Sequence, residues 1–224
     1  MYTILLFLSL MITIVSQLYI NTKYNKTNKI QNANQYTGKE VARIILDKNG
    51  LKNVKIKEVT GTLSDHYDPQ NKIVNLSSDI YNSKTIAAIS VASHECGHAI
   101  QDKNGYLFLR IRSSIVPLVN FASKIGYIII LISIITSIFK LLWIGILTEL
   151  IILLFQIITL PVEFNASSRA AKFLAKEALI EKSEQVGSKK MLNAAAMTYV
   201  ASVLSTLLSV LRLVLIVAGR DDRR

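Results

Sequence analysis

The sequence is poor in cysteine, histidine and acidic residues. Its 224 residues include one cysteine, three histidines, and 15 aspartates and glutamates against 26 lysines and arginines. The single cysteine, Cys96, cannot form a disulfide within the chain, so nothing requires an oxidising compartment. The net charge of +11 suggests nucleic acid, but the chain has no RNA or DNA motif. We therefore expect no nucleic-acid partner, and attribute the basic excess to contact with anionic lipid and a positive-inside bias.

Long apolar runs are the most prominent feature that the sequence does have. Hydrophobic residues make up 51% of it, and four runs have about the length that crosses a bilayer. The first run has lysines after it rather than before it, which favours a retained anchor over a cleaved signal peptide. Lys140 interrupts a longer apolar stretch and marks a hairpin between two spans. The four predicted spans cover residues 2–20, 117–139, 142–160 and 199–219.

Two of the three histidines form an H-E-x-x-H pattern with His94, Glu95 and His98. On a helix these histidines lie one turn apart, about 6 Å along the axis, so both imidazoles reach one zinc ion. Glu95 is then placed to take a proton from a metal-bound water. The alternative is a helix whose histidines are satisfied by the core. The small neighbours Ser93 and Gly97 favour the metal site, whereas Cys96 is predicted to be a core residue.

A polar module surrounds this pattern. Thr37 and Glu40 form a capping box for a helix that ends near Lys48. Ser83 is predicted to cap the helix that carries the histidines and ends near Lys103.

Two short strands are predicted between these helices. Residues 54–63 contain alternating apolar side chains, and residues 72–76 form the second strand, which could offer its edge to an extended substrate. The turn between them contains Asp65 and Asp68, whose carboxylates we expect to accept hydrogen bonds from backbone amides.

A catalytic zinc has three protein ligands, so one more is needed. Two spans separate His98 from Glu163, which returns the chain to the same side of the membrane where Pro161 ends the third span. Spacing therefore favours Glu163, at the start of a new helix. Asp102 is only one turn past His98, and Glu149 lies inside the bilayer. The remaining candidates are predicted to lie on a solvated helix surface: Glu177, Glu181 and Glu184.

Three stretches carry a resemblance to a known family: residues 63–69, the helix of residues 91–101, and residues 160–167. Here the sequence resembles the bacterial membrane-embedded neutral zinc metallopeptidases of the YugP-like type, which are distantly similar to HtpX-like proteases. The resemblance implies one Zn²⁺ per chain bound by His94, His98 and Glu163, with Glu95 as general base. The family often has aspartate at the position of Asn165.

Two functions follow from these residues. The first is a membrane-integrated zinc endopeptidase that hydrolyses peptide bonds in protein or peptide substrates, including membrane proteins. The second is a catalytically silent zinc-bearing membrane scaffold or chaperone-like protein. The presence of Glu95 favours the endopeptidase, because a silent protein has no need of a general base.

Further residues have open roles. His66 or Tyr67 either donates to the oxyanion of the reaction or belongs to a structural turn. Arg169 is either a substrate contact or a surface arginine. Glu149 and Arg212 lie at similar depth in the third and fourth spans, so they are predicted to pair within the membrane unless Arg212 reaches the headgroups.

The predicted fold is therefore a mainly α-helical integral membrane protein of about four spans with a small α+β zinc-metallopeptidase-like module. The apolar runs and the charge distribution predict a multi-pass membrane protein with its N-terminus outside and its active site facing the cytoplasm. The resemblance implies that the membrane is the bacterial cell membrane. The sequence gives no indication of an oligomeric state. The predicted segments are an anchor (1–20), a linker (21–36), the H-E-x-x-H module (37–114), a membrane hairpin (115–160), a helical segment with the third ligand (161–198), a C-terminal span (199–219) and a charged tail (220–224).

Overall fold

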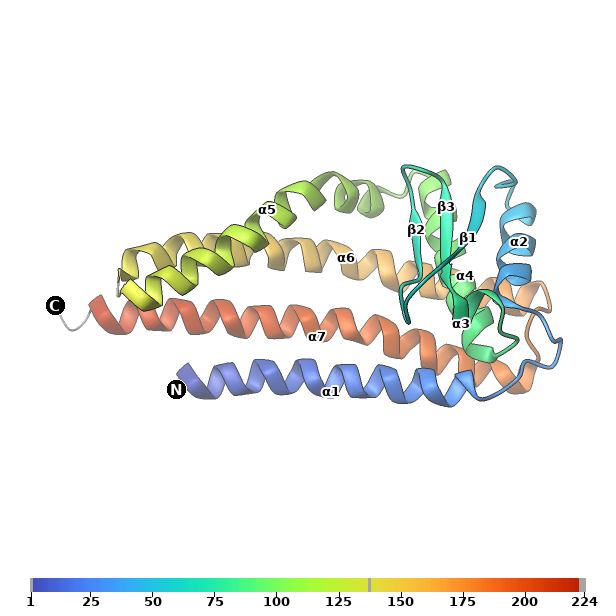
Figure 1. Ribbon diagram of the computed structural model, residues 1–224, viewed down its shortest axis with the longest axis horizontal. Helices are drawn as coiled ribbons and strands as arrows, with labels where there is room; N and C mark the ends of the chain where they lie inside the picture. The colour runs from blue at the N-terminus through green and yellow to red at the C-terminus, as the bar shows by residue number, and fades with distance from the viewer. Residues whose placement is uncertain (1, 137, 222–224) are drawn as a thin grey trace. The chain divides into compact units, whose positions relative to one another are not determined.

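The computed structural model describes residues 2–136 and 138–221, and the chain divides into two compact units. The helical unit comprises Met1–Gln17, Ile111–Leu160 and Met197–Arg224, and the mixed unit comprises Leu18–Arg110 and Pro161–Ala196. The elements follow in the order α1 (Tyr2–Asn28), α2 (Gly38–Lys48), β1 (Lys55–Val59), β2 (His66–Asp68), β3 (Ile73–Ser77), α3 (Ser78–Tyr81), α4 (Ile86–Lys103), α5 (Leu107–Thr136), the 3₁₀ turn η1 (Phe139–Leu141), α6 (Leu142–Lys176) and α7 (Lys182–Asp221) (Figure 1).

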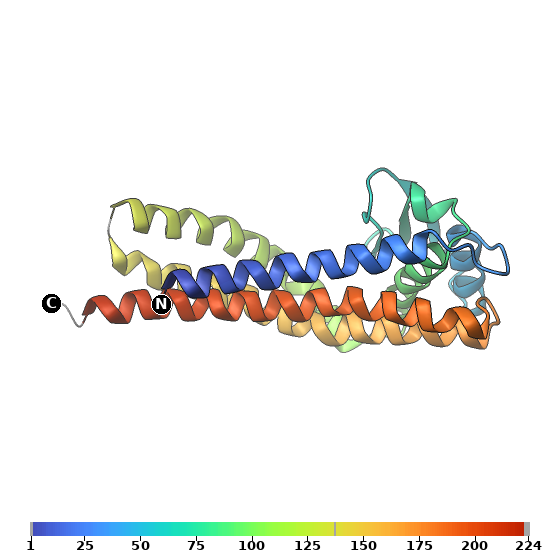
Figure 2. The same ribbon diagram turned by 90° about the horizontal axis from the view of Figure 1, so that it is seen from below.

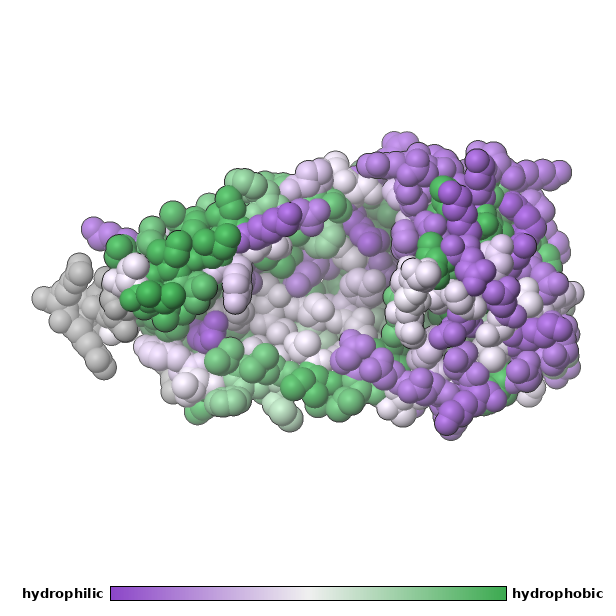
Figure 3. Space-filling model, viewed as in Figure 1, coloured by the Kyte–Doolittle hydropathy of each residue, from purple (hydrophilic) through white to green (hydrophobic). Residues whose placement is uncertain are grey.

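Four helices, α1, α5, α6 and α7, are each long and apolar enough to cross a membrane. Within the helical unit, α1 and α7 lie side by side in both views (Figures 1 and 2). The Tyr2 hydroxyl donates to the Leu215 carbonyl at 3.1 Å, and the Thr13 hydroxyl donates to Ser205 Oγ at 3.2 Å. Apolar side chains cover much of the visible surface of this unit (Figure 3), as expected where lipid is the solvent. The predicted fold class is confirmed.

The hairpin of α5 and α6 is packed too closely for larger residues. A Cβ on Gly126 would stand 2.2 Å from Thr148 Oγ1, and one on Gly145 would stand 2.5 Å from Ile130 Cγ1. Glycine at these positions therefore allows the close helix approach by which membrane helices associate.

The mixed unit contains a three-stranded sheet in the order β1-β3-β2. β1 runs parallel to β3 with Lys55 opposite Ile73, and β2 runs antiparallel to β3 with His66 opposite Asn75. Because β3 is the central strand, its edges are both occupied, and the expectation that it offers an edge to a substrate is wrong. The sheet's two outer strands are β1 and β2. The segment that forms β2 was predicted to be part of a turn.

The predicted roles of the aspartates and of the first helix cap are confirmed. Asp65 accepts a hydrogen bond from the backbone N–H of Ser77 at 2.7 Å, and Asp68 accepts one from that of Gln70 at 2.9 Å. Thr37 and Glu40 form the predicted capping box of α2. Cys96 is fully buried in the core of this unit, as predicted.

The cap of α4 differs from the prediction. Thr85 is its N-cap, and the Thr85 hydroxyl accepts from the Ala88 amide at 3.1 Å. Ser83 lies two residues too early, and its carbonyl accepts from the Gly38 amide instead.

Several helices run past their predicted ends. α6 continues through Pro161, which was expected to end the third span, so Glu163 lies in the middle of a 35-residue helix and does not open one. Proline removes one backbone hydrogen bond and its ring crowds the carbonyl four residues earlier. Beyond it Val162, Ala166 and Ala170 are fully buried, so packing maintains the helix. α1 continues to Asn28, into the predicted linker, because Tyr24 and Thr27 are buried.

The predicted helical segment of residues 161–198 is divided between two helices: its first part is the end of α6, and its part from Lys182 onward is continuous with the C-terminal span in α7, a helix of 40 residues. Residues 222–224 of the predicted tail lie outside the described residues.

Candidate metal centre

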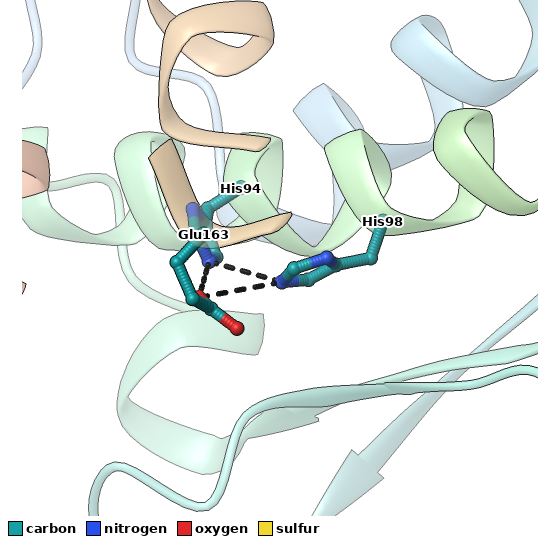
Figure 4. A group of neighbouring side chains, drawn as sticks. All are labelled: His94, His98 and Glu163. Carbon is teal, nitrogen blue, oxygen red and sulfur yellow. Dashed lines mark hydrogen bonds and ion pairs between the residues drawn. The ribbon is translucent and has the colours of Figure 1, made fainter. Parts of the chain in front are cut away.

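The candidate metal centre lies in the mixed unit, between α4 and α6. His94 and His98 are one turn apart on α4, and Glu163 comes from α6 (Figure 4). His94 Nε2 lies 3.2 Å from His98 Nε2 and 3.2 Å from Glu163 Oε2, while His98 Nε2 lies 3.7 Å from the same oxygen. Both histidines thus present the same ring nitrogen to one carboxylate. No second cluster of potential metal ligands occurs among the described residues.

These distances fit a zinc ion. Zinc binds nitrogen and oxygen at about 2.0–2.1 Å in a tetrahedron, which puts neighbouring ligand atoms about 3.3 Å apart. The three separations of 3.2, 3.2 and 3.7 Å match that edge. Two imidazoles and one carboxylate are also the donor set of a catalytic zinc site, which leaves a fourth position for water or substrate.

The other ring nitrogen of each histidine also has a partner. His98 Nδ1 donates to Gln101 Oε1 at 3.0 Å, and His94 Nδ1 lies 3.2 Å from Ser167 Oγ. Such contacts fix the orientation of metal-binding imidazoles. Neither partner was predicted from the sequence, although Gln101 lies one turn after His98 and Ser167 one turn after Glu163.

Glu95 is a buried acid beside this cluster, with only 6% of its surface exposed. Its pKa is raised to about 7, chiefly by burial; the charge of His94 opposes this shift and that of Glu163 adds to it. Within the described part of the chain its carboxylate makes no hydrogen bond, so it is available to accept a proton. A carboxyl group that titrates near neutrality is suited to general-base catalysis.

Asp102 and Glu177 have other partners. Asp102 accepts from the Tyr67 hydroxyl at 2.7 Å and pairs with Lys72 at 2.5 Å, which attaches α4 to the sheet. Glu177 pairs with Lys48.

The three residues whose roles the sequence leaves open, His66, Tyr67 and Arg169, make protein contacts in this structure. His66 is exposed; its Nδ1 donates to the Ser64 carbonyl at 2.8 Å and its Nε2 accepts from Asn75 at 3.2 Å. Tyr67 donates to Asp102, as described above. Arg169 donates through Nε to Asn165 Oδ1 at 2.7 Å. Catalytic roles for His66, Tyr67 and Arg169 stay predictions.

Glu149 and Arg212 line one cavity of about 380 Å³ in the helical unit. No ion pair within 4.0 Å joins the two residues in the structure as described, and their pairing stays a prediction.

The fold and the site together define a helical membrane protein with a His-His-Glu candidate metal centre. Residues 2–218 match the family described as "Putative neutral zinc metallopeptidase". The chain belongs to this family, which confirms the YugP-like resemblance. It is 44% identical over 208 residues to "Putative membrane protease YugP" of Bacillus subtilis (strain 168), with 92% of each chain covered. No solved structure matches the chain.

Proposed function

We propose that the protein is a membrane-integrated zinc endopeptidase. The observation that carries this proposal is the triangle of His94 Nε2, His98 Nε2 and Glu163 Oε2, with separations of 3.2–3.7 Å, beside the buried Glu95. Membership of the metallopeptidase family and the similarity to a membrane protease support it.

The residues of the site have distinct roles in this mechanism. His94, His98 and Glu163 hold one zinc ion, which when bound supplies a Lewis acid that activates water and polarises the scissile carbonyl. Glu95 accepts the proton of the attacking water and then delivers it to the leaving amine. Its burial favours this role, because the desolvated carboxylate has a raised proton affinity.

The substrate is a protein or peptide that enters in an extended conformation. β2 is one of the two outer strands of the sheet, and the Tyr67–Asp102 hydrogen bond attaches it to α4, the helix that carries both histidines. A substrate strand that pairs with the outer edge of β2 is the arrangement that this topology favours.

We further propose that the protein is a multi-pass protein of the cell membrane whose zinc site faces the cytoplasm. Lysine and arginine are dense in residues 23–112 and 169–190, while the hairpin around Lys140 is poor in them. Because the native Cys96 is buried, single cysteines at positions 48 and 140 would report topology. A membrane-impermeant thiol reagent applied to intact cells should label position 140 and not position 48, and the reverse pattern would contradict this orientation.

The activity can be tested with purified protein in detergent and a mixture of denatured protein chains as substrate. New peptide termini, counted by mass spectrometry, should appear with the zinc-loaded protein, disappear after chelation and return when zinc is restored. Cleavage that chelation leaves unchanged would contradict a zinc peptidase.

A further inference from the structure

The side chain of Gln101 joins the two halves of the candidate metal centre. It is fully buried, and its Oε1 accepts a hydrogen bond from His98 Nδ1 at 3.0 Å. Its Nε2 donates to the backbone carbonyl of Val162 at 2.8 Å. Val162 directly precedes Glu163. One amide group therefore contacts a histidine ligand on α4 and the backbone next to the carboxylate ligand on α6.

The partners on α6 leave this amide only one orientation. The Val162 carbonyl can only accept, so it must face the nitrogen of Gln101. Asn165 Oδ1 accepts a second hydrogen bond from that nitrogen at 3.0 Å. Asn165 presents its oxygen because Arg169 Nε, a group that only donates, lies 2.7 Å away. The oxygen of Gln101 must therefore face His98.

This orientation sets the tautomer of His98. A carbonyl oxygen against Nδ1 requires the proton there, which leaves the lone pair of Nε2 directed at the metal position. The tautomer of His94 is not determined by its partner. Its Nδ1 contacts the hydroxyl of Ser167 at 3.2 Å, and a hydroxyl can donate or accept.

We propose that Gln101 is a positioning residue that presets His98 for metal binding and holds α6 in place beside α4. This inference rests on the proposed zinc site. It accounts for a fully buried glutamine, since burying an amide is unfavourable unless its groups are hydrogen-bonded. It also gives Asn165 and Arg169 a role, which is to support the orientation of the amide.

The tautomer can be measured directly. With only three histidines in the chain, ¹⁵N-histidine labelling gives a sparse spectrum that distinguishes Nδ1–H from Nε2–H rings. In metal-free wild-type protein at pH 8, His98 should be the Nδ1–H form. In Gln101→Met, which keeps the side-chain length without the amide, the Nε2–H form should appear. Loss of such a contact typically weakens metal binding 10–100-fold, so the zinc dissociation constant should rise about 10–100-fold.

Ser90→Ala provides the matched control. Ser90 is also fully buried on α4, and its side chain is hydrogen-bonded to Ser188 on α7 at 2.6 Å and to the Ile86 carbonyl, not to the proposed metal ligands. Its removal should leave the His98 tautomer and the zinc affinity unchanged. Gln101→Asn is the second variant if Gln101→Met fails to fold; it keeps an amide that is one methylene too short to contact both His98 and Val162, and should change both readouts in the same direction.

Two results separate this inference from the proposed function. Folded Gln101 variants that bind zinc as tightly as wild type, with His98 still only in the Nδ1–H form, would overturn the inference. Wild-type protein that binds no zinc would instead contradict the proposed function, and the tautomer in the metal-free protein would still decide the role of Gln101.

Discussion

Gly97 lies directly against the backbone of Ala166, so that a Cβ at position 97 would stand 2.9 Å from the Ala166 carbonyl oxygen and 3.2 Å from its Cα. Gly97 is on α4 between Glu95 and His98, and Ala166 is on α6 one turn after Glu163. The absence of a side chain at Gly97 therefore determines how closely Glu163 approaches His94 and His98.

Gly97→Ala should separate the two helices and weaken zinc binding. Overpacking of this kind typically costs about 1–3 kcal/mol of stability. We expect lower thermal stability and at least about a tenfold rise in the zinc dissociation constant, as for other losses of ligand positioning, measured by competition with a chromophoric chelator. Gly187→Ala is the control: the nearest atom to its Cβ would be Thr27 Cγ2 at 4.0 Å, so this change should leave zinc affinity unaltered. Equal affinities in all three proteins would contradict the role assigned to Gly97.

Glu163→Ala should abolish stoichiometric zinc binding, because it removes one of three ligands. Glu177→Ala and Glu181→Ala should leave one zinc per chain. Glu177 pairs with Lys48 and Glu181 is exposed, so neither contributes to the cluster. Metal analysis of the purified variants is the measurement. Full zinc in Glu163→Ala together with loss in either other variant would reject the assignment.

Much of the candidate metal centre could be predicted from the sequence, because the positions of its residues follow from helix geometry and from the order of the spans. The spacing of His94 and His98 is a property of a helix, and Glu163 was favoured by counting membrane crossings. The continuation of α6 through Pro161 could not be predicted in this way. It depends on packing of Ala166 against Gly97, a contact between residues far apart in the chain.

The strand β2 could not be predicted either, because it too depends on a neighbour elsewhere in the chain. Its three residues form a strand only because β3 lies beside them, and Asp68 then stabilises the return of the chain by accepting from the Gln70 and Asn71 amides. Gln101 was missed for a related reason: its side chain is hydrogen-bonded to Val162 and Asn165, which lie more than 60 positions later.

The burial of Glu95 predicts that the free energy of unfolding of the metal-free protein depends on pH. Its pKa rises from an ordinary value of 4.5 to about 7 on folding, so the folded state binds more protons between these values and loses stability as pH rises through this window. Glu95→Gln cannot ionise. It should match wild type near pH 4 and be more stable by a few kcal/mol above pH 7. The measurement is denaturant unfolding of both proteins at both pH values with a chelator present. A difference in unfolding free energy between Glu95→Gln and wild type that does not change with pH would contradict this prediction.

The cavity between α5, α6 and α7 predicts an energetic link between Glu149 and Arg212. Both line its volume of about 380 Å³, which has room for bridging water, and Arg212 Nε is buried without a hydrogen-bond partner in the described structure. Charged groups within a membrane usually pair. Glu149→Gln and Arg212→Gln should each lower the amount of folded protein, and the double variant should recover part of the loss. Losses that simply add would show that the residues are independent.

The most direct test of the account is peptide-bond hydrolysis by Glu95→Gln at saturating zinc. This variant keeps His94, His98 and Glu163, so it should bind one zinc per chain with near wild-type affinity. Without the general base, the turnover number should fall by at least about 100-fold relative to wild type. A Glu95→Gln protein that cleaves as fast as wild type, or a zinc-loaded wild type that cleaves no substrate, would contradict a zinc endopeptidase in which Glu95 moves the proton.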